Sequence, residues 1–193
     1  MKKNSLTTAL LAGLAGAAGL VTAANAVNLN PDGLGQVLIY PFYTVDGGNN
    51  TQISVVNTTN RVKAVKVRFL EGKNSREVLD FNLYLSKYDV WVAAVLPTLE
   101  GAGIYTPDTS CTDGVVSGDE NNPTPFVNYA YTGLYDDPAN DDLDRTREGY
   151  VEIIEMGNLA AGSDTEDEVT HISGVPTCVI SGAQAAIDTV PGN

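Results

Sequence analysis

The side chains best suited to chemistry in this chain form an acidic run between residues 135 and 144. Hard oxygen ligands at such short spacing suit Ca²⁺, which outside the cell is abundant enough to fill weak sites. The run has neither the glycine nor the closing glutamate that an EF-hand loop requires. We therefore favour a solvated acidic loop, partly neutralised by Arg145 and Arg147, and a calcium site is the alternative. Its candidate ligands are Asp136, Asp137, Asn140, Asp141, Asp142 and Asp144.

Other groups of residues give little support for catalysis. His171 is the single histidine and no G-x-S-x-G elbow occurs, so a Ser-His-Asp hydrolase has no signature and zinc has too few ligands. Glu152 and Glu155 could suggest the two carboxylates of a glycosidase. Because they are three residues apart on a predicted strand, they face opposite sides and cannot flank one bond. We predict that the protein is not an enzyme, that calcium is its only candidate cofactor, and that His171 lies on the surface or in a loop.

Aromatic side chains gather in two parts of the sequence and permit two interpretations. Exposed rings could stack on sugar rings, as in carbohydrate-binding β-sandwiches. Aromatic residues in strands more often fill the core and cover its edges, and we favour that interpretation. The two groups are Tyr40, Tyr43, Tyr84, Tyr88 and Trp91, and further along Tyr129, Tyr131 and Tyr135. Asn49 and Asn57 stand in N-x-T sequons, but the bacterial type of export signal described next argues against glycosylation.

The first 26 residues predict export. Lys2 and Lys3 form a basic start, residues 6–23 are apolar, and residues 24–26 (Ala-Asn-Ala) resemble a cleavage site. This is the layout of a secretory signal peptide, here 1–26. Since the apolar stretch is rich in Ala, Gly and Thr, we expect cleavage and no stable membrane insertion afterwards, and retention as an anchor is the alternative. The expected location is the periplasm, the outer cell surface or the extracellular medium.

Charge is distributed unevenly along the chain, whose formal net charge is −13. Residues 27–99 hold six acidic and seven basic side chains, whereas residues 100–193 hold eighteen acidic ones and only Arg145 and Arg147 as basic ones. A strongly acidic surface repels nucleic acids and anionic membranes, so neither is an expected partner. The change in charge near residue 100 indicates a boundary.

Cys111 and Cys178 are the only two cysteines. In an exported chain a small, even number of cysteines predicts a disulfide. The bridge would close a loop of about 67 residues and stabilise the fold by roughly 4 kcal/mol in the chain-entropy model. The alternative is two free thiols, one of which meets a cysteine of another molecule.

Short runs with β-branched and alternating residues predict an N-terminal strand block at residues 27–96. The clearest run is 62–71, where apolar residues from Val65 to Phe69 alternate with Lys66 and Arg68. Pro41 makes the first strand an edge strand or an interrupted one, because proline has no N–H to donate. The five predicted strands cover residues 35–44, 51–57, 62–71, 76–85 and 88–96. Five strands with turn residues between them predict a mainly β, antiparallel β-sandwich.

Composition changes after this block. Residues 97–148 are rich in Gly, Pro, Asn and Asp, and they predict an acidic, loop-rich insertion with one strand at 126–132. Residues 149–193 predict a returning strand at 149–156, a solvated acidic segment at 163–168 and a tail with one or two helical turns. The last residues resemble the entrance to a further strand, so we expect a truncated form of a longer protein. A frayed terminus is the alternative.

One long run resembles a known class of domains. Residues 52–96, QISVVNTTNRVKAVKVRFLEGKNSREVLDFNLYLSKYDVWVAAVL, resemble the immunoglobulin-like sandwich domains of bacterial surface and exported proteins. The segments LDRTREGYVEIIEMG and GVPTC are similar to the continuation of a family of uncharacterised exported proteins of Gram-negative bacteria. The resemblance implies an immunoglobulin-like sandwich and an exported location, and it carries no catalytic residues.

These features predict an exported, non-enzymatic protein of the cell surface or periplasm that acts through protein–protein contact or assembly. The reasons are the export signal, the lack of a catalytic group of residues and a strand block with edges open to pairing. Other surface or envelope proteins are the expected partners. The alternative is a carbohydrate- or calcium-dependent ligand-binding module, with a polysaccharide as its partner.

Overall fold

The computed structural model describes residues 29–114, 116–138, 140–172, 174–178 and 187–188, so the predicted signal peptide lies outside the described residues. The chain divides into two units, residues 1–34 and residues 35–193. In the described part of the first unit, Asn30 accepts hydrogen bonds from the N–H groups of Asp32 and Gly33, which forms a local turn. The described helices and strands belong to the second unit.

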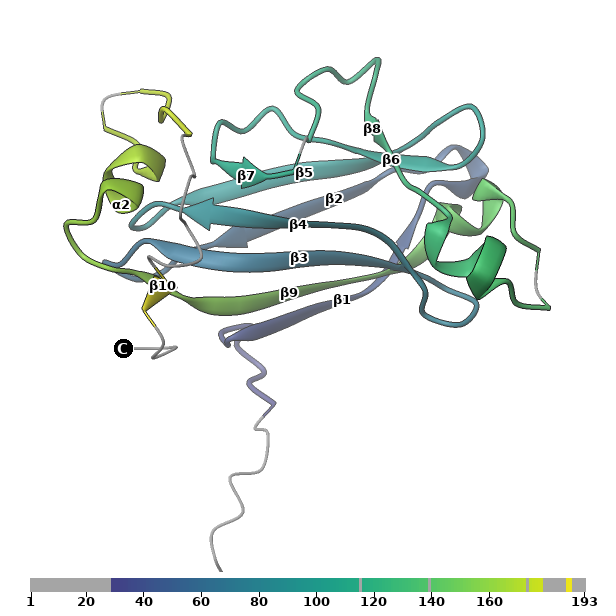
Figure 1. Cartoon of the computed structure of the whole chain (residues 1–193), viewed down its shortest axis with the longest axis horizontal. Helices are drawn as coiled ribbons and strands as arrows, with labels where there is room; N and C mark the ends of the chain where they lie inside the picture. Colours follow the sequence, from purple (N-terminus) through teal and green to yellow (C-terminus); the bar gives the residue numbers. More distant parts are fainter. Residues whose placement is uncertain (1–28, 115, 139, 173, 179–186, 189–193) are drawn as a thin grey trace, which may run out of the picture. The chain divides into compact units, whose positions relative to one another are not determined.

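Two antiparallel sheets make up the second unit (Figure 1). The six-stranded sheet has the order β1 (Val37–Thr44), β9 (Glu148–Leu159), β3 (Lys63–Glu71), β4 (Glu77–Leu85) and β7 (Thr112–Asp113), with β10 (Ile187–Asp188) paired to the far end of β9. The four-stranded sheet has the order β2 (Thr51–Val56), β5 (Val90–Pro97), β6 (Ala102–Tyr105) and β8 (Thr124–Pro125). β1 and β2 are therefore edge strands.

Helical structure is scarce and lies at the two ends of the strands. The α-helix α2 (Asp164–Val169) lies at one end, and three 3₁₀ helices lie at the other: η2 (Tyr129–Tyr131), η3 (Gly133–Tyr135) and η4 (Leu143–Arg147) (Figure 1). A further 3₁₀ helix, η1 (Asp46–Gly48), joins β1 to β2. No helix among the described residues is long and apolar enough to span a bilayer.

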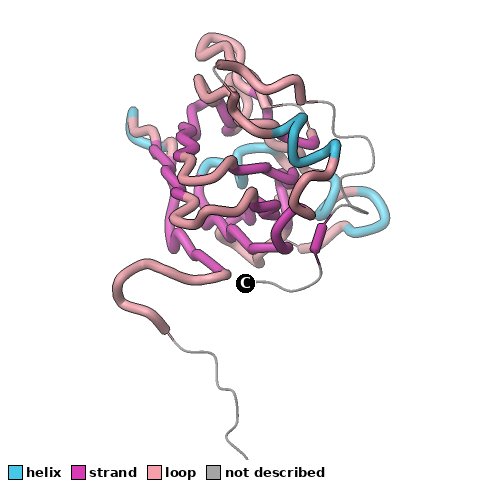
Figure 2. The backbone as a smooth tube through the Cα atoms, turned by 90° about the vertical axis from the view of Figure 1, so that its left-hand side faces the viewer, coloured by secondary structure: helices cyan, strands magenta, loops and turns pink. Residues whose placement is uncertain are grey.

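The main core lies between the two sheets. Val67 and Phe69 of β3 and Ile53 and Trp91 of the other sheet each expose 1% or less of their surface. Figure 2 views this unit along the strands, which are arranged about that interior. Burial of one such side chain contributes roughly 1.5–3 kcal/mol, so this shared core is what holds the sheets together.

A smaller apolar cluster lies where α2 covers the end of the six-stranded sheet. Ala64 and Tyr84 are cross-strand partners there, and Val169 of α2 packs on them. Cys111 and Cys178 belong to this cluster and form a disulfide with Cα atoms 5.2 Å apart. The predicted disulfide is thereby confirmed, and it ties the segment after α2 to the loop before β7.

The mainly β, antiparallel architecture is confirmed, and β1 to β5 match the five predicted strands with small differences at their ends. The predicted strand at 126–132 is wrong, because that segment contains the 3₁₀ helix η2. Phe126 and Tyr131 are both buried, and in a strand residues five apart would face opposite sides. The turn of η2 lets both rings reach the interior.

The segment 163–168 was predicted to be solvated, but it forms the N-cap and most of α2, and its Thr165 and Glu166 are buried. The Ser163 hydroxyl accepts a hydrogen bond from the N–H of Glu166, which caps the helix. Thr165 and Val169 are four residues apart and share its buried face. The structure also adds β6 within residues 97–148. The predicted helical turns of the tail lie outside the described residues, apart from the two residues of β10.

Candidate functional site

The acidic run is organised around one buried guanidinium, that of Arg145, whose side chain exposes no surface. Its Nη1 donates to both carboxylate oxygens of Asp137, at 3.0 and 3.2 Å, and to the carbonyl of Asn140 at 3.0 Å. Its Nη2 lies 3.1 Å from Glu71 Oε1, and its Cζ lies 4.1 Å from the centre of the Tyr131 ring. A protein cation therefore occupies the middle of the predicted calcium loop.

Glu71 organises the β3–β4 turn as well as this ion pair. Its carboxylate accepts hydrogen bonds from the N–H groups of Lys73, Asn74 and Arg76. Burial alone would raise the pKa of Glu71, but these donors and Arg145 outweigh burial and hold the pKa below its usual value. Burial raises the pKa of Tyr131 to about 12, so its hydroxyl is neutral beside the guanidinium.

The other predicted calcium ligands are spread over the loop surface. Asp136, Asp141 and Asp142 are exposed, and Asp144 forms an ion pair with Arg147 at 2.8 Å. Within the described part of the chain, no group of three or more His, Cys, Asp or Glu side chains is placed to hold a metal ion. Calcium binding stays a prediction.

His171 lies in the loop after α2, and its contacts were not foreseen. Its Nδ1 lies 2.9 Å from Ser86 Oγ and 3.3 Å from Asp89 Oδ2, and its Nε2 lies 3.1 Å from Thr109 Oγ1. The Ser86 hydroxyl also donates to the carbonyl of Val169 and accepts from the backbone N–H of His171. These bonds fasten the end of α2 to the β4–β5 turn.

Glu152 and Glu155 form separate ion pairs. Glu152 lies 2.9 Å from Arg68 Nη1, and Glu155 lies 2.6 Å from Lys63 Nζ. Their register partners on β3 are Arg68 and Val65, which lie on opposite faces of the sheet. The two carboxylates therefore share no site.

Most of the aromatic side chains belong to the core, as favoured. Tyr43, Tyr84, Trp91 and Tyr131 each expose 2% or less of their surface. Tyr40 is half-buried and its hydroxyl donates to the carbonyl of Ser54 on β2, whereas Tyr88, Tyr129 and Tyr135 are exposed.

The two sequon asparagines differ in burial. Asn57 exposes 2% of its surface, and its amide donates to the backbone carbonyls of Arg61, Leu85 and Ser86. Asn49 is exposed and donates to the carbonyl of Asp46. Asn57 therefore serves as a buried connector of two turns.

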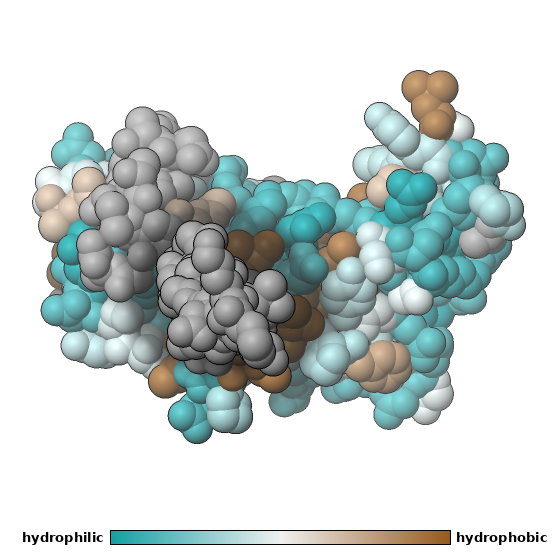
Figure 3. Space-filling model, turned by 90° about the horizontal axis from the view of Figure 1, so that it is seen from below, coloured by the Kyte–Doolittle hydropathy of each residue, from teal (hydrophilic) through white to brown (hydrophobic). Residues whose placement is uncertain are grey.

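Edge strand β1 carries several large apolar side chains on the surface. Leu38 and Tyr40 face inward, while Val37, Ile39 and Phe42 expose 54%, 63% and 58% of their surface. A register shift between Tyr40 and Tyr43 gives Phe42 an outward direction despite its even number. Figure 3 shows hydrophobic side chains gathered in the middle of the face on the β1 side. We call Val37, Ile39 and Phe42 the β1 stripe.

Among the described strands β1 pairs only with β9, so its backbone is open to pairing along this stripe. The N–H of Glu155 donates to the carbonyl of Gln36 at 2.7 Å, so even-numbered residues direct their backbone groups toward β9. Val37 and Ile39 accordingly direct theirs to the opposite side. Pro41 follows in the same alternation and brings no N–H, which ends the run of possible partners.

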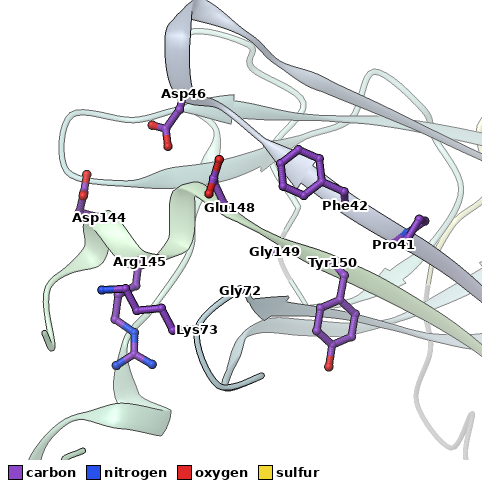
Figure 4. Close-up of a pocket in the computed structure, with 10 residues that line it drawn as sticks. All are labelled: Pro41, Phe42, Asp46, Gly72, Lys73, Asp144, Arg145, Glu148, Gly149 and Tyr150. Atoms are coloured by element: carbon purple, nitrogen blue, oxygen red, sulfur yellow. The ribbon is translucent and has the colours of Figure 1, made fainter. Parts of the chain in front are cut away.

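A pocket of about 440 Å³ lies at the Phe42 end of the stripe. Its walls come from β1, β9, η1, η4 and the β3–β4 turn (Figure 4). The carboxylates of Asp46, Asp144 and Glu148 line one side with the Phe42 ring next to Glu148, and Lys73, Arg145 and Tyr150 lie on the other side (Figure 4). The pocket therefore combines negative charge with aromatic surface.

Gly149 of β9 lines the pocket, and close packing requires a glycine at this position. A Cβ at this position would lie 2.0 Å from the carbonyl oxygen of Leu70 and 2.8 Å from the Tyr43 ring. Only glycine lets β9 approach β3 and Tyr43 so closely. The sequence did not predict this pocket, because its walls come from five separate segments. Pro41 was the one signal that indicated an edge strand at this position.

No protein family model, curated protein or solved structure matches this chain.

Proposed function

We propose that this chain is an exported, non-enzymatic protein of the periplasm or cell surface that acts through protein–protein contact at strand β1. The observation that carries the proposal is the β1 stripe, in which three large apolar side chains are each more than half exposed on an edge strand. Soluble proteins usually protect such edges with charges, prolines, bulges or covering loops, and on β1 Pro41 and the register shift come only after Val37 and Ile39. A partner strand that pairs with β1 would cover the stripe and use the open backbone groups.

Other features support the export part of the proposal. The Cys111–Cys178 disulfide is the kind of bond that persists in an oxidising compartment. The net charge of −13 argues against nucleic acid or an anionic membrane as the partner. Other envelope or surface proteins remain the class that we expect.

An immunoglobulin-type arrangement with the acidic loop as an insertion is part of the same proposal. Trp91 lies fully buried in the core of a two-sheet fold, as the tryptophan of antibody domains does. The disulfide differs from that pattern, because it packs in the smaller cluster at the end of one sheet rather than in the main core.

The test places a photo-activated cross-linking residue at position 39 in cells that make the protein. We expect one discrete cross-linked product, which Val37→Lys reduces because a lysine in the stripe opposes edge pairing. The matched control is position 56 on the other edge strand, where Val56 is 51% exposed. Equal products from positions 39 and 56, or none from position 39, would contradict the proposal.

A second candidate, a ligand-binding module for carbohydrate or calcium, draws on the pocket. Exposed rings beside carboxylates suit a sugar, whose faces stack on the rings while its hydroxyls donate to oxygen. A ligand that binds only the folded state raises the melting temperature. Melting curves with millimolar CaCl₂ or with a soluble polysaccharide therefore test this candidate, and unchanged curves count against it.

A further inference from the structure

We infer that the partner segment that adds to β1 is basic, and that one of its Lys or Arg side chains enters the pocket beside Phe42. The inference rests on the proposed function of β1 and gives the partner its chemistry. It joins two features that meet at one place, the β1 stripe and the pocket at its end.

The geometry of a strand brings a partner side chain to the pocket. A strand rises about 3.3 Å per residue, so the three steps from Ile39 to Phe42 span roughly 10 Å. A segment paired with Val37 and Ile39 that continues past Pro41 then passes over the pocket, which Pro41 and Phe42 themselves line. Because Pro41 donates no hydrogen bond, the segment is held there by its side chain rather than by backbone pairing.

Charge favours a cation in that position. Asp46, Asp144 and Glu148 lie along one wall of the pocket (Figure 4). Of the nearby cations, Arg145 is fully buried and paired with Glu71 and Asp137, so it neutralises those groups instead of the wall. Arg147 pairs with Asp144 at 2.8 Å, so the wall carboxylates that favour a partner cation are those of Asp46 and Glu148. Lys73 also lines the pocket, and its Nζ contacts the side chain of Asn140.

The aromatic rings favour the same kind of side chain. Phe42 is 58% exposed and stands beside Glu148 at the mouth of the pocket (Figure 4). A cation over an aromatic face is attracted by the electrons of the ring, and a guanidinium can stack on the ring while it binds a carboxylate. A neutral or acidic side chain would gain neither contribution.

The same charges argue against a second copy of this chain as the occupant. Two copies paired at β1 would bring together chains that each carry a net charge of −13. Like charges across an interface cost free energy, so a different, basic partner fits this edge better.

The test uses the protein as purified from cells that produce it, with nitrogen-15 labelling, and synthetic eight-residue peptides. In these peptides threonine and valine alternate, and arginine stands at the first or the last position. The control peptides carry citrulline, which has the same shape without the charge. We expect an arginine peptide to shift the amide signals of Val37, Ile39 and Phe42 and to bind about tenfold more tightly than its citrulline counterpart. The ratio of the two peptide affinities should fall toward one at high salt, because salt screens the charge of the arginine.

Two double variants locate the charge effect. Asp46→Asn with Glu148→Gln should bring the affinity of the arginine peptide to that of the citrulline peptide. Glu100→Gln with Glu120→Gln changes the net charge equally at exposed positions outside the pocket and should leave the affinity unchanged. Equal losses in both double variants would overturn the inference, because the effect would then come from overall charge.

Other outcomes separate the inference from the proposed function. Equal affinity for arginine and citrulline peptides overturns the basic preference, while strand addition at β1 stands. Free arginine amide that binds as tightly as the peptide shows a small-cation site and overturns the strand partner. Shifts with neither peptide overturn the inference, and cross-linking at position 39 then decides the proposed function separately.

Discussion

The guanidinium of Arg145 lies 3.1 Å from the carboxylate of Glu71, and neither side chain exposes any surface. Through this contact the acidic loop is attached to the β3–β4 turn, because Arg145 also binds Asp137 and Glu71 also binds the turn N–H groups. One buried cation therefore joins Asp137 of the acidic loop to Glu71 of the turn.

Arg145→Met should destabilise the fold strongly. It leaves two buried or half-buried carboxylates without their cation, and removal of one partner of a buried pair costs about 3–5 kcal/mol. Chemical denaturation measures the free energy of unfolding. The control is Arg147→Met, since the Arg147–Asp144 pair is exposed and such pairs contribute about 0–1 kcal/mol. Similar losses in the two variants would contradict the assigned role of Arg145.

Acid should weaken the fold in part through Glu71, whose pKa is lowered in the folded state. A lowered carboxyl pKa stabilises the fold above the unfolded pKa, about 4.3 for glutamate, and this contribution is lost as pH falls through the folded pKa. Glu71→Gln should therefore be less stable than the unmodified protein at pH 7, and the difference should shrink below about pH 4. Urea titrations at several pH values measure the difference in unfolding free energy between the two proteins. A difference that stays constant with pH would contradict this role of Glu71.

Gly149→Ala should be among the most damaging single substitutions. Its Cβ would lie 2.0 Å from the Leu70 carbonyl oxygen, a backbone atom that cannot move without disturbing β3. We expect a loss above roughly 3 kcal/mol, with overpacking as the cause. Gly72→Ala is the matched control in the same pocket, because its Cβ would meet the nearest atom at an ordinary 3.5 Å. Thermal denaturation measures the melting temperatures of both variants. Equal melting temperatures would contradict the expected overpacking at Gly149.

Asn57→Ala should lower the free energy of unfolding more than Asn49→Ala does, although each asparagine stands in an N-x-T sequon. Loss of the Asn57 amide removes three hydrogen bonds that its Nδ2 donates to the carbonyls of Arg61, Leu85 and Ser86, at about 0.5–1.5 kcal/mol for each bond. Asn49 is exposed, so water replaces its single bond to Asp46. The two free energies of unfolding are directly comparable, and a larger loss for Asn49→Ala would be inconsistent with the structure.

Local patterns predicted much of the fold. Strand β3 was predictable because its apolar and charged residues alternate, and β4 and β9 were predictable from their β-branched and apolar runs. The helix α2 escaped prediction, because its acidic side chains hid the spacing of Thr165 and Val169 on one face. The short strand β6 escaped because a run of four residues carries little periodicity.

The candidate site was predictable only in part. Pro41 indicated an edge strand, and the exposed edge of the six-stranded sheet is where the structure has β1. The outward direction of Phe42 depends on the register shift after Tyr40. Strict alternation along β1 would have predicted that Phe42 faces inward, like Leu38 and Tyr40. The pocket depends on five separate segments, so no stretch of sequence contains its pattern.

The sequence by itself determined the strand-rich class of this protein, its strong negative charge and the pair of cysteines available for a bridge. These are properties of composition and short-range periodicity, which need no knowledge of distant contacts. Only the tertiary structure decided that Arg145, 74 residues from Glu71 along the chain, would pair with it, and that among the described strands β1 would have a neighbour on one side only. Burial and pairing depend on which segments meet in space, and that follows from the packing of the whole core.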